Sequence, residues 1–231
     1  MRTSAESMAA YTDMRERLSV VLADVDDDTA AATAVPACPG WSVADLAAHV
    51  YGVARDVSDG NVDGAGTDAW TASQVERFAP LGLAATVAAW NEVGPGFEAS
   101  ASGFPEAIAA QIVFDSGAHE QDVRGALVRP GARDAASVQI GIEFIAASLG
   151  RLAEERGLAG VELVTPDVTV VVGPGGDRLR LEADTFTVSR ALTGRRSTAQ
   201  IAALPWEGDP TPYLAVFDTS PIRPPADAIL E

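Results

Sequence analysis

The sequence predicts two domains, an all-helical domain over residues 1–158 and a small α+β domain over residues 159–231. Before residue 158, apolar residues recur every three or four positions in successive segments, which is the period of helices that bury one face. Glycine- and proline-rich stretches divide these segments, as loops do in a helical bundle. After Gly160 the chain changes to short β-branched runs separated by glycine and proline.

The first helix is predicted over residues 5–25. Its apolar side chains follow helical spacing at Met8, Tyr11, Met14, Leu18, Val21 and Leu22. The acidic run at residues 24–28 is expected to end this helix in a solvated turn. Two prolines and a glycine within residues 35–40 then predict a rigid loop.

A second helix begins after Trp41. Ser42 is a natural N-cap, and Asp45 stands three residues later in the acidic position of a capping box. His49 lies on the edge of this helix's apolar stripe, so it should face other helices. A single inward histidine is usually a packed core residue, and its role therefore needs further support.

The middle of the chain contains three predicted elements. Residues 59–67 are rich in glycine and aspartate and should form a surface loop, which is either a connector or a lid. A short helix follows over residues 69–78. A third long helix is expected over residues 82–92, with the glycine-proline-glycine run at 94–96 ending it.

The fourth long helix is predicted over residues 104–127, with Pro105 in the favourable first turn. One of its faces is traced by Ile108, Ile112, Asp115, His119, Asp122 and Ala126. Polar groups lie in the middle of this face and apolar groups lie toward its ends. Such a pattern is typical of a site sunk into a helical bundle.

Later elements are shorter. We expect, in order, a helix at 134–156, strands at 168–172 and 178–181, a helix at 185–193 and a last strand at 213–217. Asp134 should cap the first of these helices, and Gly194 should end the second. The glycine-rich residues 173–177 predict that the two strands form a hairpin.

Composition restricts the function. The formal charge of −17 argues against nucleic acid and anionic membranes as partners. No stretch approaches the apolar length of a membrane span, and the polar residues 1–8 do not resemble a signal peptide, so a cytoplasmic location is expected. All sixteen basic residues are arginine, which excludes lysine Schiff-base chemistry. The single cysteine, Cys38, excludes an internal disulfide and a multi-cysteine zinc site.

Asp115 and His119 form the candidate site. Residues four apart on a helix share one face, so this carboxylate and imidazole can point at the same spot. If the helix that carries His49 packs alongside, the three side chains form a histidine–carboxylate–histidine set, which holds a divalent metal and leaves one position open. The alternative is an ordinary helix surface with one polar pair.

A family resemblance strengthens this hypothesis. The run Cys38-Pro-Gly-Trp41-Ser-Val-Ala-Asp-Leu-Ala-Ala-His49 resembles the "PGW…DL..H" signature of the mycothiol-dependent maleylpyruvate isomerase family, in the DinB-like helical-bundle superfamily. The resemblance implies that a histidine from this helix joins an E-x-x-x-H pair to bind a divalent metal, commonly zinc. Asp115 and His119 match that pair, with aspartate replacing the glutamate. Because aspartate is one methylene shorter, the metal must lie closer to the helix axis or the helix must shift.

The resemblance extends to the end of the chain. The run from Ala191 to Gln200, together with Trp206 to Asp209, is similar to the sterol-carrier-like domain appended in actinobacterial members. It implies a metal- and mycothiol-dependent transferase or isomerase that acts on a small electrophilic substrate. The alternative is a non-catalytic metal-binding, ligand-binding or regulatory protein of the same fold, and metal-dependent hydrolysis is a third possibility. A requirement for added thiol separates the first from the third.

Four further residues have candidate roles. Asp122, one turn beyond His119, could orient an imidazole or could simply be solvated. Arg195 and Arg196 could bind a carboxylate of the cofactor or substrate, although surface pairing is the commoner role of such a pair. Cys38 has no base beside it in the sequence, so an inert thiol is expected. The substrate and the oligomeric state cannot be read from the sequence.

Overall fold

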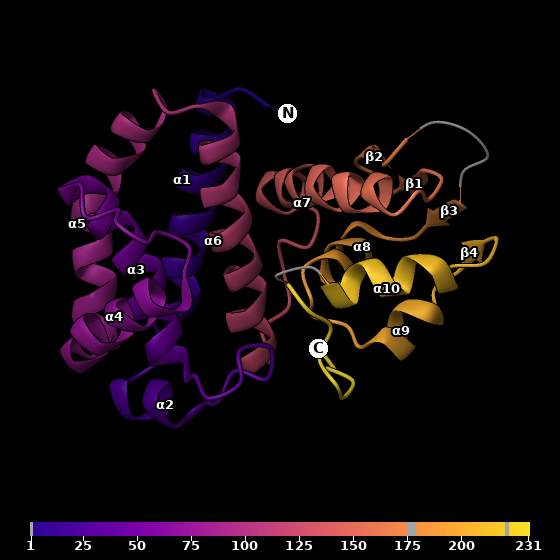
Figure 1. Cartoon of the computed structure of the whole chain (residues 1–231). Helices are drawn as coiled ribbons and strands as arrows, with labels where there is room; N and C mark the ends of the chain where they lie inside the picture. The colour runs from indigo at the N-terminus through magenta and orange to yellow at the C-terminus, as the bar shows by residue number, and fades with distance from the viewer. Residues whose placement is uncertain (1, 175–178, 220–221) are drawn as a thin grey trace. The chain divides into compact units, whose positions relative to one another are not determined.

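The computed structural model describes residues 2–174, 179–219 and 222–231. The chain forms two compact units, which we call the N-terminal unit (Arg2–Gly131) and the C-terminal unit (Ala132–Leu230). The first is a helical bundle, and the second combines helices with a small sheet (Figure 1). The predicted fold class, a helical bundle followed by a small α+β domain, is confirmed.

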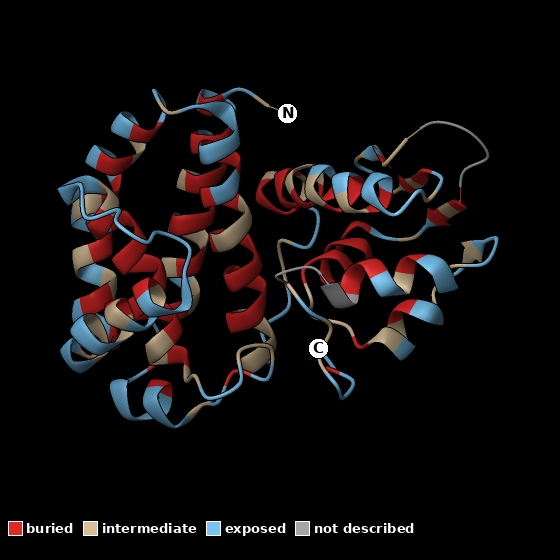
Figure 2. Cartoon of the chain, viewed as in Figure 1, coloured by how far each residue is buried: buried red, intermediate tan, exposed pale blue. Residues whose placement is uncertain are grey.

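The N-terminal unit is built around four long helices. Its elements are α1 (Ser4–Leu22), α2 (Asp27–Ala32), α3 (Val43–Asp59), α4 (Asp68–Phe78), the 3-10 turn η1 (Ala79–Leu81), α5 (Leu83–Ala101) and α6 (Glu106–Ala126). α3 packs against α4, α5 and α6, while α1 packs against α5 and α6. The buried residues gather on the faces that these helices turn to one another (Figure 2). The predicted helices of this part of the chain are present.

One predicted helix end is wrong, because α5 continues through residues 94–96. Arg15 from α1 lies across this stretch. Its Nε donates to Glu98 Oε1 (2.6 Å) and its Nη1 donates to Asn91 Oδ1 (2.5 Å). The two acceptors lie on either side of the proline, so this buried arginine ties both halves of the helix together. Tertiary contacts here outweigh the local preference of proline to end a helix.

The C-terminal unit places helices against a mixed sheet. Its elements are α7 (Ala136–Glu155), β1 (Val161–Val164), β2 (Thr169–Val172), β3 (Leu179–Glu182), α8 (Thr185–Leu192), α9 (Thr198–Ala202), β4 (Trp206–Glu207) and α10 (Thr211–Thr219). The strand order is β2-β1-β3-β4, with β1 antiparallel to β2 and parallel to β3, and β4 antiparallel to β3. α7 packs against α8, α10 and β2.

The structure corrects three expectations for this unit. The predicted hairpin between β2 and β3 does not form, because β1 lies between them and pairs with both. The actual hairpin joins β1 to β2, through a turn in which Val168 N–H donates to Thr165 Oγ1 (2.9 Å). Residues 213–217 belong to the helix α10 and not to a strand. Asp134 does not cap α7, whose N-cap is Ala135. Residues 175–178 lie outside the described part of the chain.

The division into units differs from the predicted boundary after residue 158. α7 precedes that boundary, yet its packing against α8, α10 and β2 places it in the C-terminal unit. Periodicity identifies α7 as an amphipathic helix but does not show which neighbours cover its apolar face.

Within the described ranges, no helix has the length and apolar character that crossing a membrane requires.

Candidate metal centre

The candidate site lies where α3 packs against α6 in the N-terminal unit. The predicted capping box starts α3: Ser42 Oγ accepts from the Asp45 N–H (3.2 Å), and Asp45 Oδ2 accepts from the Ser42 N–H (2.8 Å). This fixed start sets the direction in which His49 points from α3. His49 is buried, as expected.

The structure brings His49, Asp115 and His119 together. His49 Nε2 lies 3.3 Å from Asp115 Oδ2, and His119 Nε2 lies 3.6 Å from Asp115 Oδ1. The two imidazole rings meet edge-on, with ring centroids 5.1 Å apart. One donor atom from each side chain lies within 4.8 Å of the others, close enough for one metal ion. The shorter aspartate therefore reaches both imidazoles without the extra methylene of glutamate.

Each imidazole directs its other nitrogen away from this set. His119 Nδ1 lies 3.0 Å from Asp122 Oδ2, and His49 Nδ1 lies 2.8 Å from Gln74 Oε1. Both partners are acceptors, so each Nδ1 carries a hydrogen and each Nε2 faces Asp115. Histidines that ligate metals show this arrangement, in which an outer acceptor fixes the ring. The donors present thus fit a divalent metal.

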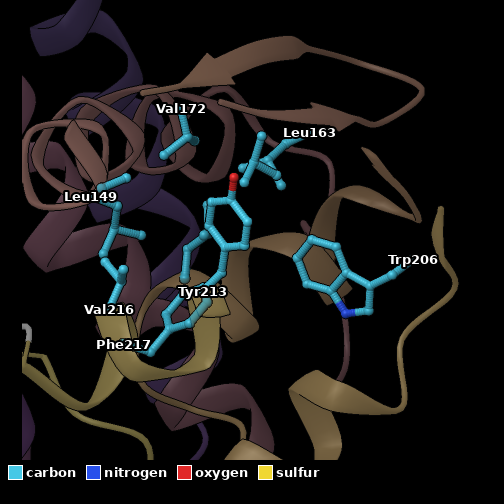
Figure 3. Close-up of a pocket in the computed structure, with 10 residues that line it drawn as sticks. Leu149, Leu163, Val172, Trp206, Tyr213, Val216 and Phe217 are labelled. Atoms are coloured by element: carbon cyan, nitrogen blue, oxygen red, sulfur yellow. The ribbon is translucent and has the colours of Figure 1, made fainter. Parts of the chain in front are cut away.

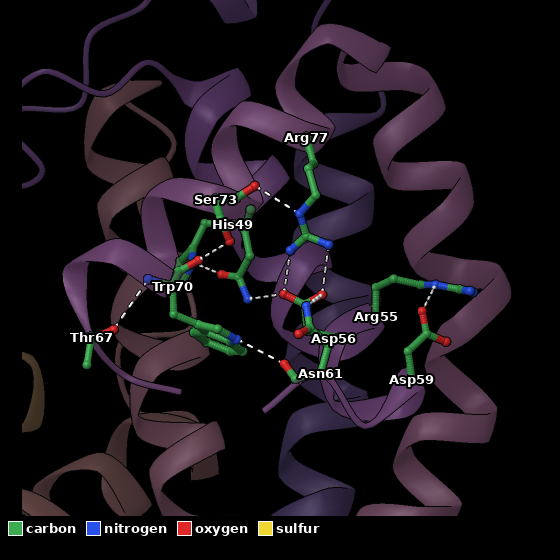
Figure 4. A network of polar contacts seen from close by, with 10 residues as sticks. His49, Arg55, Asp56, Asp59, Asn61, Thr67, Trp70, Ser73 and Arg77 are labelled. Carbon is green, nitrogen blue, oxygen red and sulfur yellow. Dashed lines mark hydrogen bonds and ion pairs between the residues drawn. The ribbon is translucent and has the colours of Figure 1, made fainter. Parts of the chain in front are cut away.

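Gln74 was not predicted as part of the site. It lies on α4 and is fully buried, and its amide also contacts Asp56. Asp56 in turn accepts two hydrogen bonds from Arg77 (2.9 and 2.6 Å), and Figure 4 shows this polar network beside His49. No spacing rule connects Gln74 to His49, because the contact joins two separate helices.

Trp41 and Cys38 lie beside the imidazoles. The Trp41 ring centroid is 5.4 Å from that of His49 and 6.3 Å from that of His119. Cys38 Sγ lies 3.9 Å from His119 Nδ1, and its S–H donates to Asp122 Oδ2 (3.5 Å). Although the sequence places no base next to Cys38, the fold brings His119 and Asp122 beside it.

The loop that carries Cys38 and Trp41 turns at Gly40. This residue adopts a φ of +88°, a left-handed conformation that favours glycine.

Ionisation of the site follows from these contacts. Burial raises the pKa of the Asp115 carboxyl, but the charge of His49 and the hydrogen bonds from both imidazoles lower it by more. The pKa is therefore well below its usual value. Burial lowers the pKa of His119, whereas Asp115, Asp122 and Cys38 raise it by more, and the net effect is a raised pKa. The pair thus exists as a carboxylate beside an imidazolium when no metal is bound.

The site opens on the side of Asp115. The Asp115 side chain is 35% exposed, whereas those of His49 and His119 are 4% and 11% exposed. A ligand can therefore approach past the carboxylate, while the imidazoles are shielded.

Arg195 and Arg196 belong to the C-terminal unit, where Arg195 donates to Thr193 O (2.6 Å) and Arg196 to Arg195 O (2.7 Å). Their role in binding a cofactor or substrate stays a prediction.

The C-terminal unit contains an apolar cavity (Figure 3). Its lining residues are Leu149, Ala153, Val161, Leu163, Val172, Leu192, Trp206, Tyr213, Val216 and Phe217. The volume of about 20 Å³ admits only a water-sized group, far less than the hundreds of Å³ of an ordinary ligand pocket. As it stands, the cavity is a packing gap.

Comparison with known proteins gives one family and two structures. The family model described as "Mycothiol maleylpyruvate isomerase N-terminal domain" matches residues 11–172. A crystal structure of the mycothiol-dependent maleylpyruvate isomerase is 15% identical, with a TM-score of 0.52. A structure of a histidine-to-alanine mutant of a mycothiol-dependent maleylpyruvate isomerase is 13% identical, with a TM-score of 0.57. Each similarity covers 84% of this chain and 92% of the other. No curated protein matches.

Proposed function

Because the chain belongs to the mycothiol maleylpyruvate isomerase family, we propose that it is an isomerase that depends on a divalent metal and on mycothiol. The observation that carries the metal dependence is the convergence of two imidazole Nε2 atoms on one carboxylate, with both Nδ1 atoms facing outer acceptors. A small electrophile is the proposed substrate class, and maleylpyruvate is the first compound to test.

We assign the metal to His49, Asp115 and His119. Two imidazole nitrogens and a carboxylate oxygen suit zinc, and three protein ligands leave a position for a further ligand. When bound, such a metal lowers the pKa of a thiol and holds the thiolate. The rest of the mechanism concerns what the protein's own side chains contribute.

The surrounding residues orient the donors and limit access of water. Asp122 accepts from His119 Nδ1–H and so holds that ring with Nε2 directed at Asp115. Trp41 covers both imidazoles with an apolar ring, which restricts entry to the side of Asp115. Arg195 and Arg196 are proposed to bind a carboxylate of mycothiol or of the substrate, since guanidinium groups bind carboxylates in a two-point contact.

The first experiment measures metal content by elemental mass spectrometry on the untagged protein. About one metal ion per chain is expected for the wild type, with loss of metal in His49→Ala and Asp115→Ala. Asp59→Ala is the matched control, because Asp59 is an exposed carboxylate on α3 that pairs with Arg55 (2.8 Å) away from the site. Circular dichroism establishes that the variants stay folded.

Turnover of maleylpyruvate then separates the candidate functions. The proposed isomerase needs both the metal and added mycothiol, whereas a metal-dependent hydrolase works without thiol. A binding protein that only retains the metal shows no turnover under either condition. A wild-type protein that stays free of metal after zinc is added back would exclude the proposed function.

A further inference from the structure

We propose that Gln74 is a positioning residue that fixes the tautomer of His49, and that Asp56 fixes the direction of the Gln74 amide. The effect on metal affinity rests on the function proposed above. The tautomer itself can be measured without metal.

The argument starts from the two ends of the amide. A glutamine side chain presents an acceptor oxygen at one end and an NH₂ donor at the other, so its hydrogen-bond partners determine which end faces which neighbour. Gln74 Nε2 lies 3.0 Å from Asp56 Oδ2, and Gln74 Oε1 lies 2.8 Å from His49 Nδ1. An ionised carboxylate only accepts hydrogen bonds. The NH₂ end must therefore face Asp56, which leaves the oxygen for His49.

Asp56 is held in the ionised state. Arg77 donates to both carboxylate oxygens (2.9 and 2.6 Å), and Asn61 Nδ2 adds a third hydrogen bond (3.0 Å). Burial raises the pKa of Asp56, but these donors lower it by more, so its pKa falls below the usual value. Asp56 is 1% exposed, which means that it cannot exchange these partners for water.

The direction of each hydrogen bond then follows along the chain of contacts. Arg77 donates to Asp56, and Gln74 donates to Asp56 and accepts from His49, so His49 carries a hydrogen on Nδ1. Nε2 is then the nitrogen left for a metal, and in the metal-free protein the ionised Asp115 carboxylate, 3.3 Å away, competes for a hydrogen on it. A partly exposed arginine on α4 thus determines which nitrogen of a buried histidine is free to bind a metal.

Packing holds Gln74 in place. A Cβ built on Gly52 of α3 would lie 2.6 Å from Gln74 Cβ, so the absence of a side chain there lets α4 approach α3. On the other side, Trp70 Nε1–H of α4 donates to Asn61 O (3.0 Å), which anchors α4 to the chain that follows α3 (Figure 4). The amide therefore has little freedom to turn away from either partner.

The two histidines use acceptors of different charge. His119 donates to the carboxylate of Asp122, whereas His49 donates to a neutral amide. A glutamate at position 74 would add a second buried negative charge beside Asp56, which costs free energy unless it is compensated. Glutamine avoids this cost and still supplies an acceptor.

Zinc affinity is the first readout. Gln74→Met removes the acceptor but keeps the side-chain length, and we expect zinc to bind about 10- to 100-fold more weakly. Asp56→Asn lets the amide turn and should also weaken binding. The double variant Gln74→Glu/Asp56→Asn reverses the roles of the two side chains and again presents an oxygen to His49, so it should recover most of the affinity. The control Asp59→Asn, on the same helix as Asp56, should leave the zinc affinity unchanged.

The second readout is the His49 tautomer in metal-free protein, by ¹⁵N NMR of histidine-labelled samples. With only two histidines in the chain, the ring signals of His49 are assigned by their loss in His49→Ala. Asp115→Ala removes the competing acceptor at Nε2. In that variant we expect neutral His49 to be the Nδ1–H form, and adding Gln74→Met should shift it toward the Nε2–H form.

The outcomes separate the two proposals. If the wild type binds no zinc, the proposed metal function fails, and the tautomer measurement still decides the role of Gln74. If zinc binds but Gln74→Met leaves the tautomer unchanged, the positioning role is overturned. If Gln74 had only a structural role, the double variant Gln74→Glu/Asp56→Asn would bind zinc as weakly as Gln74→Met does. That result would also overturn the positioning role.

Discussion

At the scale of single residues, the chemistry of the site depends on which ring nitrogen of each histidine carries a hydrogen. Asp122 fixes this for His119 through a carboxylate, and Gln74 does so for His49 through an amide. The two Nε2 atoms consequently converge on Asp115. The site is therefore an arrangement of five side chains, of which only three would touch a metal.

The raised pKa of His119 predicts opposite effects of pH on the metal-free and zinc-loaded protein. Without metal, the imidazolium is stabilised by Asp115 and Asp122, so its contribution is fully present below its ordinary pKa of 6.5 and is lost as the pH rises through the higher folded-state value. Asp115, whose pKa is lowered, contributes stability that is fully present above its ordinary pKa of 3.8 and is lost as the pH falls toward the lowered value. Together, the two groups stabilise the metal-free protein most between pH 3.8 and pH 6.5.

Zinc reverses this trend, because it must displace the proton from His119. Stabilisation by zinc should grow as the pH rises through the raised pKa. The measurement is the free energy of unfolding against pH, with zinc or with chelator, for the wild type and His119→Gln. We expect the substitution to cost the metal-free protein about 1–3 kcal/mol near pH 6 and less at higher pH. A cost in metal-free protein that increases with pH would contradict the assigned ionisation.

The sequence predicted this residue-scale arrangement in part. Asp115 and His119 are four apart on one helix, so their proximity follows from helical geometry alone. His49 comes from another helix, so its place in the set depended on the expectation that this helix packs alongside, which the family resemblance strengthened. Gln74 and Cys38 were missed as neighbours, because their contacts with His49 and His119 depend on how α4 and the loop before α3 pack.

At the scale of elements, helix α5 shows how tertiary contacts override a local signal. Its glycine-proline-glycine run predicted an end, yet the helix continues because Arg15 bridges it from α1. The two glycines in this run have different surroundings. A Cβ at Gly94 would lie 2.5 Å from Arg15 Nε, whereas a Cβ at Gly96 would meet nothing within 4 Å.

This difference predicts opposite effects for two matched substitutions. Gly94→Ala should destabilise the protein by about 1–3 kcal/mol, because the new methyl group displaces a buried arginine from Glu98 and Asn91. Gly96→Ala should stabilise it by about 0.5–1 kcal/mol, because alanine favours a helix interior and has open space. Chemical denaturation of both variants tests the pair. Equal effects of the two substitutions would mean that Arg15 does not constrain this helix.

The elements also show where periodicity succeeds and where it fails. Ser42 and Asp45 form a purely local cap, so the start of α3 was predicted correctly. The strand β1 was missed, and with it the turn at Pro166 and Asp167 that joins β1 to β2. Proline followed by aspartate is a turn signal, and it could have placed the hairpin there. The parallel pairing of β1 with β3 is a long-range contact that no local pattern encodes.

At the scale of the whole molecule, the position of α7 determines where the chain can be divided. The bundle prediction counted this helix with the N-terminal domain, because its apolar stripe resembles those of the preceding helices. In the structure α7 packs against α8, α10 and β2, and its Leu149 and Ala153 line the cavity of the C-terminal unit. The proposed metal donors and Gln74 all lie before Gly131.

Two fragments should therefore behave differently. A fragment of residues 1–131 retains the candidate donors and their outer partners, so we expect it to fold and to bind zinc with the affinity of the full chain, within about threefold, if neighbouring segments contribute independently. A fragment of residues 1–158 adds α7 without α8, α10 and β2. Its apolar face, which includes Val138, Ile142, Ile145 and Leu149, would then lack those partners and promote association.

Size-exclusion chromatography and zinc titration of the two fragments test this division. We expect the shorter fragment to be monomeric and the longer one to self-associate or precipitate, while thiol-dependent turnover is lost from the shorter one if Arg195 and Arg196 bind substrate or cofactor. The reverse result, with residues 1–158 folded and residues 1–131 unfolded, would show that α7 stabilises the bundle. In that case the boundary predicted from the sequence would describe the folding unit better than the packing of α7 does.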